Sequence, residues 1–89
     1  MHVEVYSKTD CPYCKLTKEY LTQHGIPFDE FIFDDYNARQ AMYDKFGLVG
    51  NQRTVPQIVI DGTRIGGYTD LIKSDVVARF NAGKFDEDF

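Results

Sequence analysis

The only two cysteines of this chain, Cys11 and Cys14, lie three positions apart, and this spacing limits how the chain can fold. A disulfide between them closes a very short loop and stabilises a fold by about 2 kcal/mol, against about 5 kcal/mol for a 100-residue loop. A structural zinc ion needs further ligands, and His2 and His24 lack the paired spacing that accompanies such cysteines. The chain must therefore fold on a hydrophobic core, and we expect no metal.

The composition fits one such core. The chain has 89 residues, of which 43% are apolar and 27% charged, so we expect a single domain over residues 1–83. The acidic residues 84–89 are typical of a flexible C-terminal tail.

Charge and hydropathy exclude several classes of function. The net charge of −4 offers no excess positive field for nucleic acid. No apolar stretch approaches the roughly 20 residues of a membrane-spanning helix, so we expect no membrane partner. The first residues include Glu4 and lack the apolar segment of a secretory signal, which predicts a cytoplasmic location.

The first third of the chain has the pattern of a strand, a helix and a second strand. Residues 2–6 alternate apolar and polar side chains, as a strand does, and Pro12 favours a helix that begins at position 11 or 12. Gly25 ends that helix, and residues 28–33 predict the second strand. Two strands joined through a helix are expected to pair in parallel.

The remainder predicts a helix, a hairpin and a last helix. Residues 37–46 have helical spacing of apolar side chains, and Asp61-Gly62 is a type I′ turn signal between strands at 57–60 and 63–65. Apolar residues from Leu71 onward predict a final helix that ends near Gly83. The expected fold is α/β, in the order β-α-β-α-β-β-α, with a four-stranded mixed sheet and helices on both faces.

The two cysteines at the start of the first helix predict thiol chemistry. The unpaired N–H groups of a helix N-terminus stabilise a thiolate at Cys11, and C-x-x-C thiols have pKa values of about 3.5 to 7.5, against about 8.5 for free cysteine. Cys14 lies deeper on the same helix face, where burial favours the protonated thiol. Cys11 is therefore the expected nucleophile and Cys14 the resolving thiol.

Three separate motifs make the run from Val3 to Phe80 resemble a dithiol glutaredoxin of the thioredoxin-fold superfamily. They are Cys11-Pro12-Tyr13-Cys14, Thr54-Val55-Pro56 and Gly66-Gly67-Tyr68-Thr69-Asp70. Relatives often have Cys or Ser where this chain has Tyr68, which changes the shape of that end of the groove.

The resemblance implies a cis peptide before Pro56 and glutathione as co-substrate. It implies that the Val55 backbone pairs with the cysteinyl part of glutathione, and that Lys8 and Tyr13 face its glycyl end, with help from Arg39 or Gln40. It also implies that the Thr69 and Asp70 region holds the γ-glutamyl end, although the same residues would suit an ordinary helix cap. The implied glutathione-binding residues are Lys8, Cys11, Tyr13, Gln40, Thr54, Val55, Pro56, Gly67, Thr69 and Asp70.

The function implied is an enzyme that reduces glutathione mixed disulfides and protein disulfides, with ribonucleotide reductase as a candidate partner. We expect a monomer. Two alternatives remain open. One is a glutaredoxin-like redoxin that thioredoxin reductase reduces. The other is a glutathione-dependent iron–sulfur cluster carrier that would hold its cluster between two subunits.

Overall fold

The structure, a computed structural model, describes residues 1–87 of the chain. Its strands are β1 (Val3–Ser7), β2 (Asp29–Ile32), β3 (Gln57–Ile60) and β4 (Thr63–Gly66). Its helices are α1 (Pro12–Gln23), α2 (Tyr36–Lys45), α3 (Tyr68–Lys73) and α4 (Val76–Glu87), with a short 3-10 helix at Gly50–Gln52. No helix within this part of the chain is both long and apolar enough to cross a membrane.

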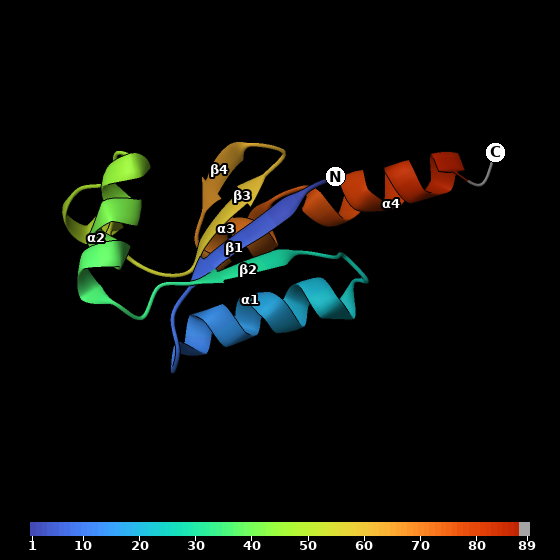
Figure 1. The fold of residues 1–89 in the computed structure, drawn as a ribbon. Helices are drawn as coiled ribbons and strands as arrows, with labels where there is room; N and C mark the ends of the chain where they lie inside the picture. Colours follow the sequence, from blue (N-terminus) through green and yellow to red (C-terminus); the bar gives the residue numbers. More distant parts are fainter. Residues whose placement is uncertain (88–89) are drawn as a thin grey trace.

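The four strands form one mixed sheet in the order β2-β1-β3-β4 (Figure 1). As the sequence predicts, β1 pairs with β2 in parallel and β3 pairs with β4 antiparallel. The structure adds that β3 also pairs with β1 antiparallel. The β3–β4 turn has positive φ at both central residues, 50° at Asp61 and 82° at Gly62, as a type I′ turn requires. The predicted mixed sheet is confirmed.

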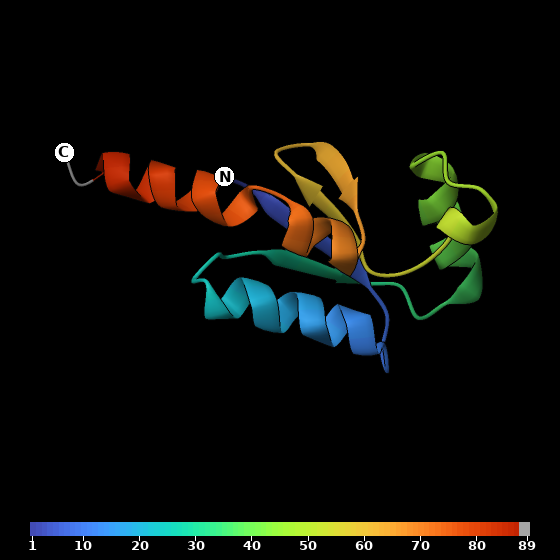
Figure 2. The ribbon, with the colours of Figure 1, turned by 180° about the vertical axis from the view of Figure 1, so that it is seen from behind.

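One face of the sheet carries the main hydrophobic core. The side chains of Val3 and Val5, two positions apart, both point toward this face. They pack there with Ile58, Leu21 of α1 and Leu71 of α3. Helices α1 and α3 contact each other and lie on the same side of the sheet (Figure 2). Because these side chains are almost fully excluded from water, the core holds α1, the helix that begins at the cysteines, against the sheet.

Helix α2 covers the opposite face only at one end. It lies beyond the carboxyl end of β2 (Figure 1). Its buried side chains form a second hydrophobic cluster with Leu48, which lies in the loop after α2. Tyr6 on β1 packs against this cluster, but Phe31, next to Tyr6 on the same face, remains 40% exposed. The sequence correctly predicted helices on both sides, and the structure shows that the second side is covered in part.

The last helical segment differs from the prediction of one helix that ends near Gly83. Ser74 has an extended backbone, with ψ of 170°, and separates α3 from α4. Its hydroxyl donates a hydrogen bond to the Leu71 carbonyl (2.6 Å) and accepts one from the Val76 N–H (3.3 Å). One serine therefore closes α3 and opens α4, a competition with helical hydrogen bonding that serine side chains often make.

The structure describes part of the segment that the sequence predicts to be a C-terminal tail. Helix α4 continues through Gly83 to Glu87, so residues 84–87 of the expected tail are helical. The last two residues of that expected tail, 88–89, lie outside the described residues.

Candidate active site

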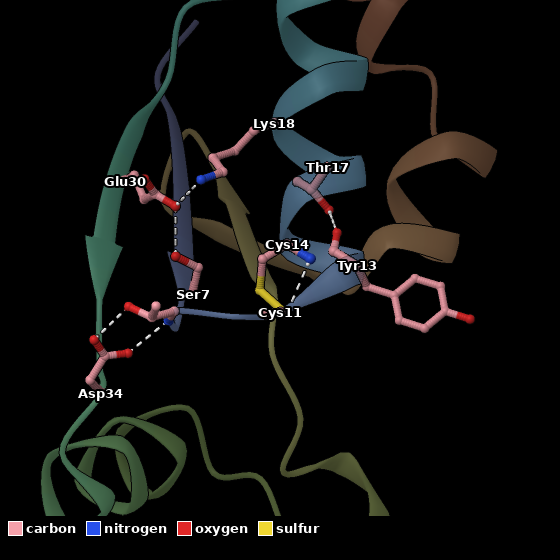
Figure 3. Close-up of polar contacts among 9 residues, drawn as sticks. Ser7, Cys11, Tyr13, Cys14, Thr17, Lys18, Glu30 and Asp34 are labelled. Carbon is pink, nitrogen blue, oxygen red and sulfur yellow. Dashed lines mark hydrogen bonds and ion pairs between the residues drawn. A yellow bond between two sulfur atoms is a disulfide. The ribbon is translucent and has the colours of Figure 1, made fainter.

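The two cysteines lie at the first turn of α1, where they are joined in a disulfide (Figure 3). Cys11 is the N-cap residue, and its sulfur accepts a hydrogen bond of 3.2 Å from the Cys14 N–H. Pro12 occupies the first helical position, where a backbone N–H would have no hydrogen-bond partner within the helix. Cys11 is partly exposed and Cys14 is only 2% exposed, so Cys11 is the more accessible sulfur for an incoming substrate.

A clamp from the chain after β2 holds the loop that leads to Cys11. The Thr9 hydroxyl and the Thr9 N–H donate hydrogen bonds of 2.6 and 2.7 Å to the Asp34 carboxylate (Figure 3). These two bonds, together with nearby Arg39 and Lys8, lower the pKa of Asp34. Asp10 follows with a left-handed backbone at φ 56°, and the loop leaves Lys8 exposed beside Cys11.

The loop before β3 approaches the cysteines from the other side. The Val55–Pro56 peptide bond is cis, the geometry that the resemblance implies. The Val55 carbonyl oxygen lies 3.8 Å from the Cys11 sulfur. The Gln57 side chain donates a hydrogen bond of 2.8 Å to the Thr54 carbonyl and is itself buried. The loop is therefore held from the interior of the protein.

A groove of about 460 Å³ lies between these two loops and α2. Six of the residues implied by the resemblance line it: Lys8, Cys11, Tyr13, Gln40, Thr54 and Val55. Arg39 and Arg53 add two further cationic side chains, and Asp10 adds the one acidic side chain of its lining. The groove therefore joins the reactive sulfur to an end that favours an anionic ligand.

Of the remaining implied residues, Pro56 directly follows Val55 in the loop before β3, and the other three lie at the start of α3, outside that groove. Gly67 stands against the cis-proline loop, because a Cβ at Gly67 would lie 3.5 Å from the Pro56 carbonyl oxygen. The Asp70 carboxylate accepts a hydrogen bond of 3.0 Å from the Gly67 N–H, so it serves as a cap in this structure. Thr69 is exposed. Apart from Pro56, the structure thus divides the implied set into a groove group and an α3 group.

Tyr13 bridges the two groups. Its ring lies 6.1 Å from the ring of Tyr68 at the start of α3, and its side chain points away from the disulfide (Figure 3). Tyr13 is 60% exposed, so the aromatic pair borders the cysteines at the protein surface.

A second hollow, of about 710 Å³, lies between α1 and β2. Both cysteines are among its lining residues. The Glu30 carboxylate in its lining accepts a hydrogen bond of 2.8 Å from Ser7 and pairs with Lys18 at 3.0 Å (Figure 3). Burial acts to raise the pKa of Glu30, but the contacts with Ser7 and Lys18 outweigh it and leave the pKa lowered. Among the described residues, no group of three or more His, Cys, Asp or Glu side chains is placed to hold a metal ion.

Arg53 is the groove residue that the sequence reasoning missed. It directly precedes Thr54-Val55-Pro56, and its side chain contacts both the loop after α2 and α2 itself. Its adjacency to that motif was the available signal, but a long side chain in a loop has no periodic pattern that predicts its contacts.

Comparison with known proteins agrees with this geometry. The Glutaredoxin family model matches residues 3–65. Glutaredoxin 3 of Escherichia coli K12 is 41% identical over 75 residues, covering 83% of this chain and 86% of that protein. The crystal structure of glutaredoxin 1 from Francisella tularensis, complexed with cacodylate, has a TM-score of 0.77 at 38% identity and covers 90% of this chain and 96% of that one.

A buckwheat glutaredoxin solved as a glutathione complex has a TM-score of 0.67 at 32% identity, over 80% of this chain and 64% of that one. The matched region contains the C-P-Y-C pair at the start of α1 and the loop before β3. The cysteine pair, the mixed sheet and these matches together show that the chain belongs to the glutaredoxin family and is a thiol-disulfide oxidoreductase.

Proposed function

We propose that this oxidoreductase uses glutathione to reduce two kinds of substrate, glutathione mixed disulfides and protein disulfides. The observation that carries the proposal is the cationic groove that runs from Cys11 past Val55. Glutathione is a tripeptide with two carboxylates and a central thiol, so a groove that binds it needs a cationic end for a carboxylate and a reactive sulfur near the thiol. Lys8 and Cys11 are both in its lining.

The backbone at Val55 supports the proposed binding mode. Its N–H makes no hydrogen bond to another described residue, and its carbonyl faces the Cys11 sulfur at 3.8 Å. An extended cysteinyl segment of glutathione could form the two backbone hydrogen bonds of a short added strand there. Pro56 has no N–H, so the following position does not compete for such a ligand.

The first proposed route needs one thiol of the enzyme. The Cys11 thiolate attacks the glutathionyl sulfur of a mixed disulfide, and the substrate leaves as a thiolate that takes up a proton. A second glutathione, as thiolate, then attacks the Cys11-bound glutathione, which releases glutathione disulfide and restores the Cys11 thiolate. Neither step uses Cys14, whose burial keeps it from the incoming glutathione.

The second proposed route needs both thiols. The Cys11 thiolate attacks one sulfur of a protein disulfide and forms a mixed disulfide with it, and the other sulfur of that disulfide leaves as a thiolate and takes up a proton. Cys14 loses its proton and attacks the Cys11 sulfur, the protein leaves as a thiolate, and the Cys11–Cys14 disulfide forms. That product has the connectivity of the present structure. Two glutathione molecules then reduce it and become glutathione disulfide.

The decisive experiment compares two sources of electrons. The protein is assayed with a small mixed disulfide, once with glutathione and glutathione reductase and once with thioredoxin reductase alone. We expect NADPH consumption with the glutathione system only. Turnover with thioredoxin reductase and none with glutathione would contradict the proposal and favour the redoxin alternative.

The same proposal covers the setting of the reaction. We propose a monomer in the cytoplasm, with ribonucleotide reductase among the disulfide substrates to be tried first. Size-exclusion chromatography of protein purified without oxygen, with glutathione present, tests the state of assembly. A coloured dimer would instead favour the iron–sulfur carrier.

A further inference from the structure

The Arg53 side chain connects α2 to the loop that follows it. Nε donates a hydrogen bond of 2.9 Å to the Leu48 carbonyl, and Nη1 donates one of 2.7 Å to Gln40 Oε1. Nη2 pairs with the Asp44 carboxylate. The guanidinium also lies 5.9 Å from the centre of the Tyr43 ring, and only 29% of the side chain is exposed. Four contacts therefore hold this side chain in one place.

These contacts decide which end of the Gln40 amide is free. A guanidinium has donors and no acceptor, so it must meet the carbonyl end of an amide. The Gln40 NH₂ group, which can only donate, is then the end without this partner. Gln40 lines the groove beside Cys11 together with Lys8 and Arg39, so its free donor belongs to a wall that favours an anion.

We propose that Arg53 is a positioning residue that orients the Gln40 amide to donate to a carboxylate in the groove. The inference rests on the proposed use of glutathione, and the carboxylate is that of its glycyl residue. Asp44 neutralises the Arg53 charge, so the contribution of Arg53 comes from its geometry. Without Arg53, the Gln40 amide can rotate and present its carbonyl oxygen, which repels a carboxylate.

The competing role for Arg53 is direct charge attraction of the same carboxylate, and lysine separates the two roles. Lysine keeps the positive charge, but its single ammonium cannot reproduce the planar fork that reaches Leu48, Gln40 and Asp44 together. Arg53→Lys should therefore behave like a loss of function if Arg53 positions Gln40. It should behave like the wild type if Arg53 acts as a charge.

The test measures kcat and KM for glutathione and for its glycyl ethyl ester, which lacks that carboxylate. We expect the wild type to have a KM about tenfold lower for glutathione than for the ester, as befits one hydrogen bond to a charged group. Arg53→Lys should remove most of this preference, with kcat within about twofold. Arg79→Lys is the matched control, because Arg79 also pairs with an aspartate, Asp61, but outside the groove.

A double-mutant cycle shows whether Arg53 acts through Gln40. Gln40→Leu should remove the same preference, and the double variant should be no worse than either single variant. Gln40→Glu provides a second approach, since glutamate can still accept from Arg53 but offers no donor to the groove. It should raise the KM for glutathione and leave that for the ester nearly unchanged.

Each outcome is decisive. Arg53→Lys with a wild-type preference for glutathione, or multiplicative effects in the double variant, would overturn the inference. A wild type that turns over glutathione and its ester with equal KM would also overturn it, while the proposed function would survive. A wild type that does not use glutathione at all would overturn both.

Discussion

Replacing Gly66 with alanine should destabilise the protein through a specific collision at the start of α3. Gly66 has φ of +119°, a conformation that costs other residues on the order of 1–3 kcal/mol. An alanine Cβ there would lie 2.2 Å from an Asp70 carboxylate oxygen, so the Asp70 side chain must move. Moving it breaks the hydrogen bond of 3.0 Å from the Gly67 N–H.

The expected magnitude combines these two effects. Loss of a helix N-terminal cap costs about 0.5–2 kcal/mol, so Gly66→Ala should lower the free energy of unfolding by about 1.5–5 kcal/mol. Gly62→Ala is the matched control, because Gly62 also has positive φ, +82°, but no atom lies within 4 Å of its added Cβ. Gly62→Ala should lower the free energy of unfolding by the backbone contribution alone, about 1–3 kcal/mol.

Equilibrium urea unfolding of the oxidised protein measures both losses, provided that the slope with urea stays unchanged. An Asp70→Ala background tests the mechanism. There the carboxylate is absent and only the Cβ of residue 70 remains, 3.2 Å from the added Cβ, so adding Gly66→Ala should cost little more than Gly62→Ala does. If Gly66→Ala costs under about 0.5 kcal/mol in the wild type, or the same in both backgrounds, the assigned contact between Gly66 and Asp70 is wrong.

Four further substitutions test the chemistry and the electrostatics. Cys11→Ser should abolish both activities, whereas Cys14→Ser should keep reduction of glutathione mixed disulfides and lose most reduction of protein disulfides, because a tethered thiol has a high effective concentration. Equal loss of both activities in Cys14→Ser, measured with one substrate of each kind, would contradict this division. Asp70→Ala should raise the KM for glutathione about 10- to 150-fold while the alkylation rate of reduced Cys11 stays unchanged, and an unaltered KM would remove Asp70 from the proposed site. Because the folded pKa of Glu30 is lowered, its contribution to stability is present above the unfolded pKa, about 4.3, and lost as pH falls through the folded value. Glu30→Gln should therefore lose less stability than the wild type in urea unfolding between neutral and acidic pH, and parallel losses would show that the contacts of Glu30 do not stabilise the fold.

Short-range signals explain why most elements were predictable. Pro12 at the start of α1 and Asp61-Gly62 in the hairpin act on their own backbone, through a restricted φ or a tolerated positive φ. The break between α3 and α4 at Ser74 was not predicted, because it does not depend on a short-range signal alone. Serine is compatible with a helix interior, and whether its hydroxyl captures the Val76 N–H depends on how α3 and α4 pack against the sheet.

The sequence by itself determined the order of strands and helices, the mixed sheet and the place of both cysteines at a helix start. These features depend on the spacing of apolar residues and on local backbone preferences, which a chain contains before it folds. A resemblance carried by three short motifs added the cis peptide before Pro56 and six of the residues that line the groove.

Only the tertiary structure decided how those residues are held. The Thr9 clamp on Asp34 joins positions 25 residues apart, and the contact between Arg53 and Gln40 joins positions 13 apart. Neither pair shares a helix or a strand, so no periodic pattern in the sequence indicates it. Such contacts form only when the packed core has brought their loops together, because the free energy of a single hydrogen bond, about 1 kcal/mol, cannot order two separate loops on its own.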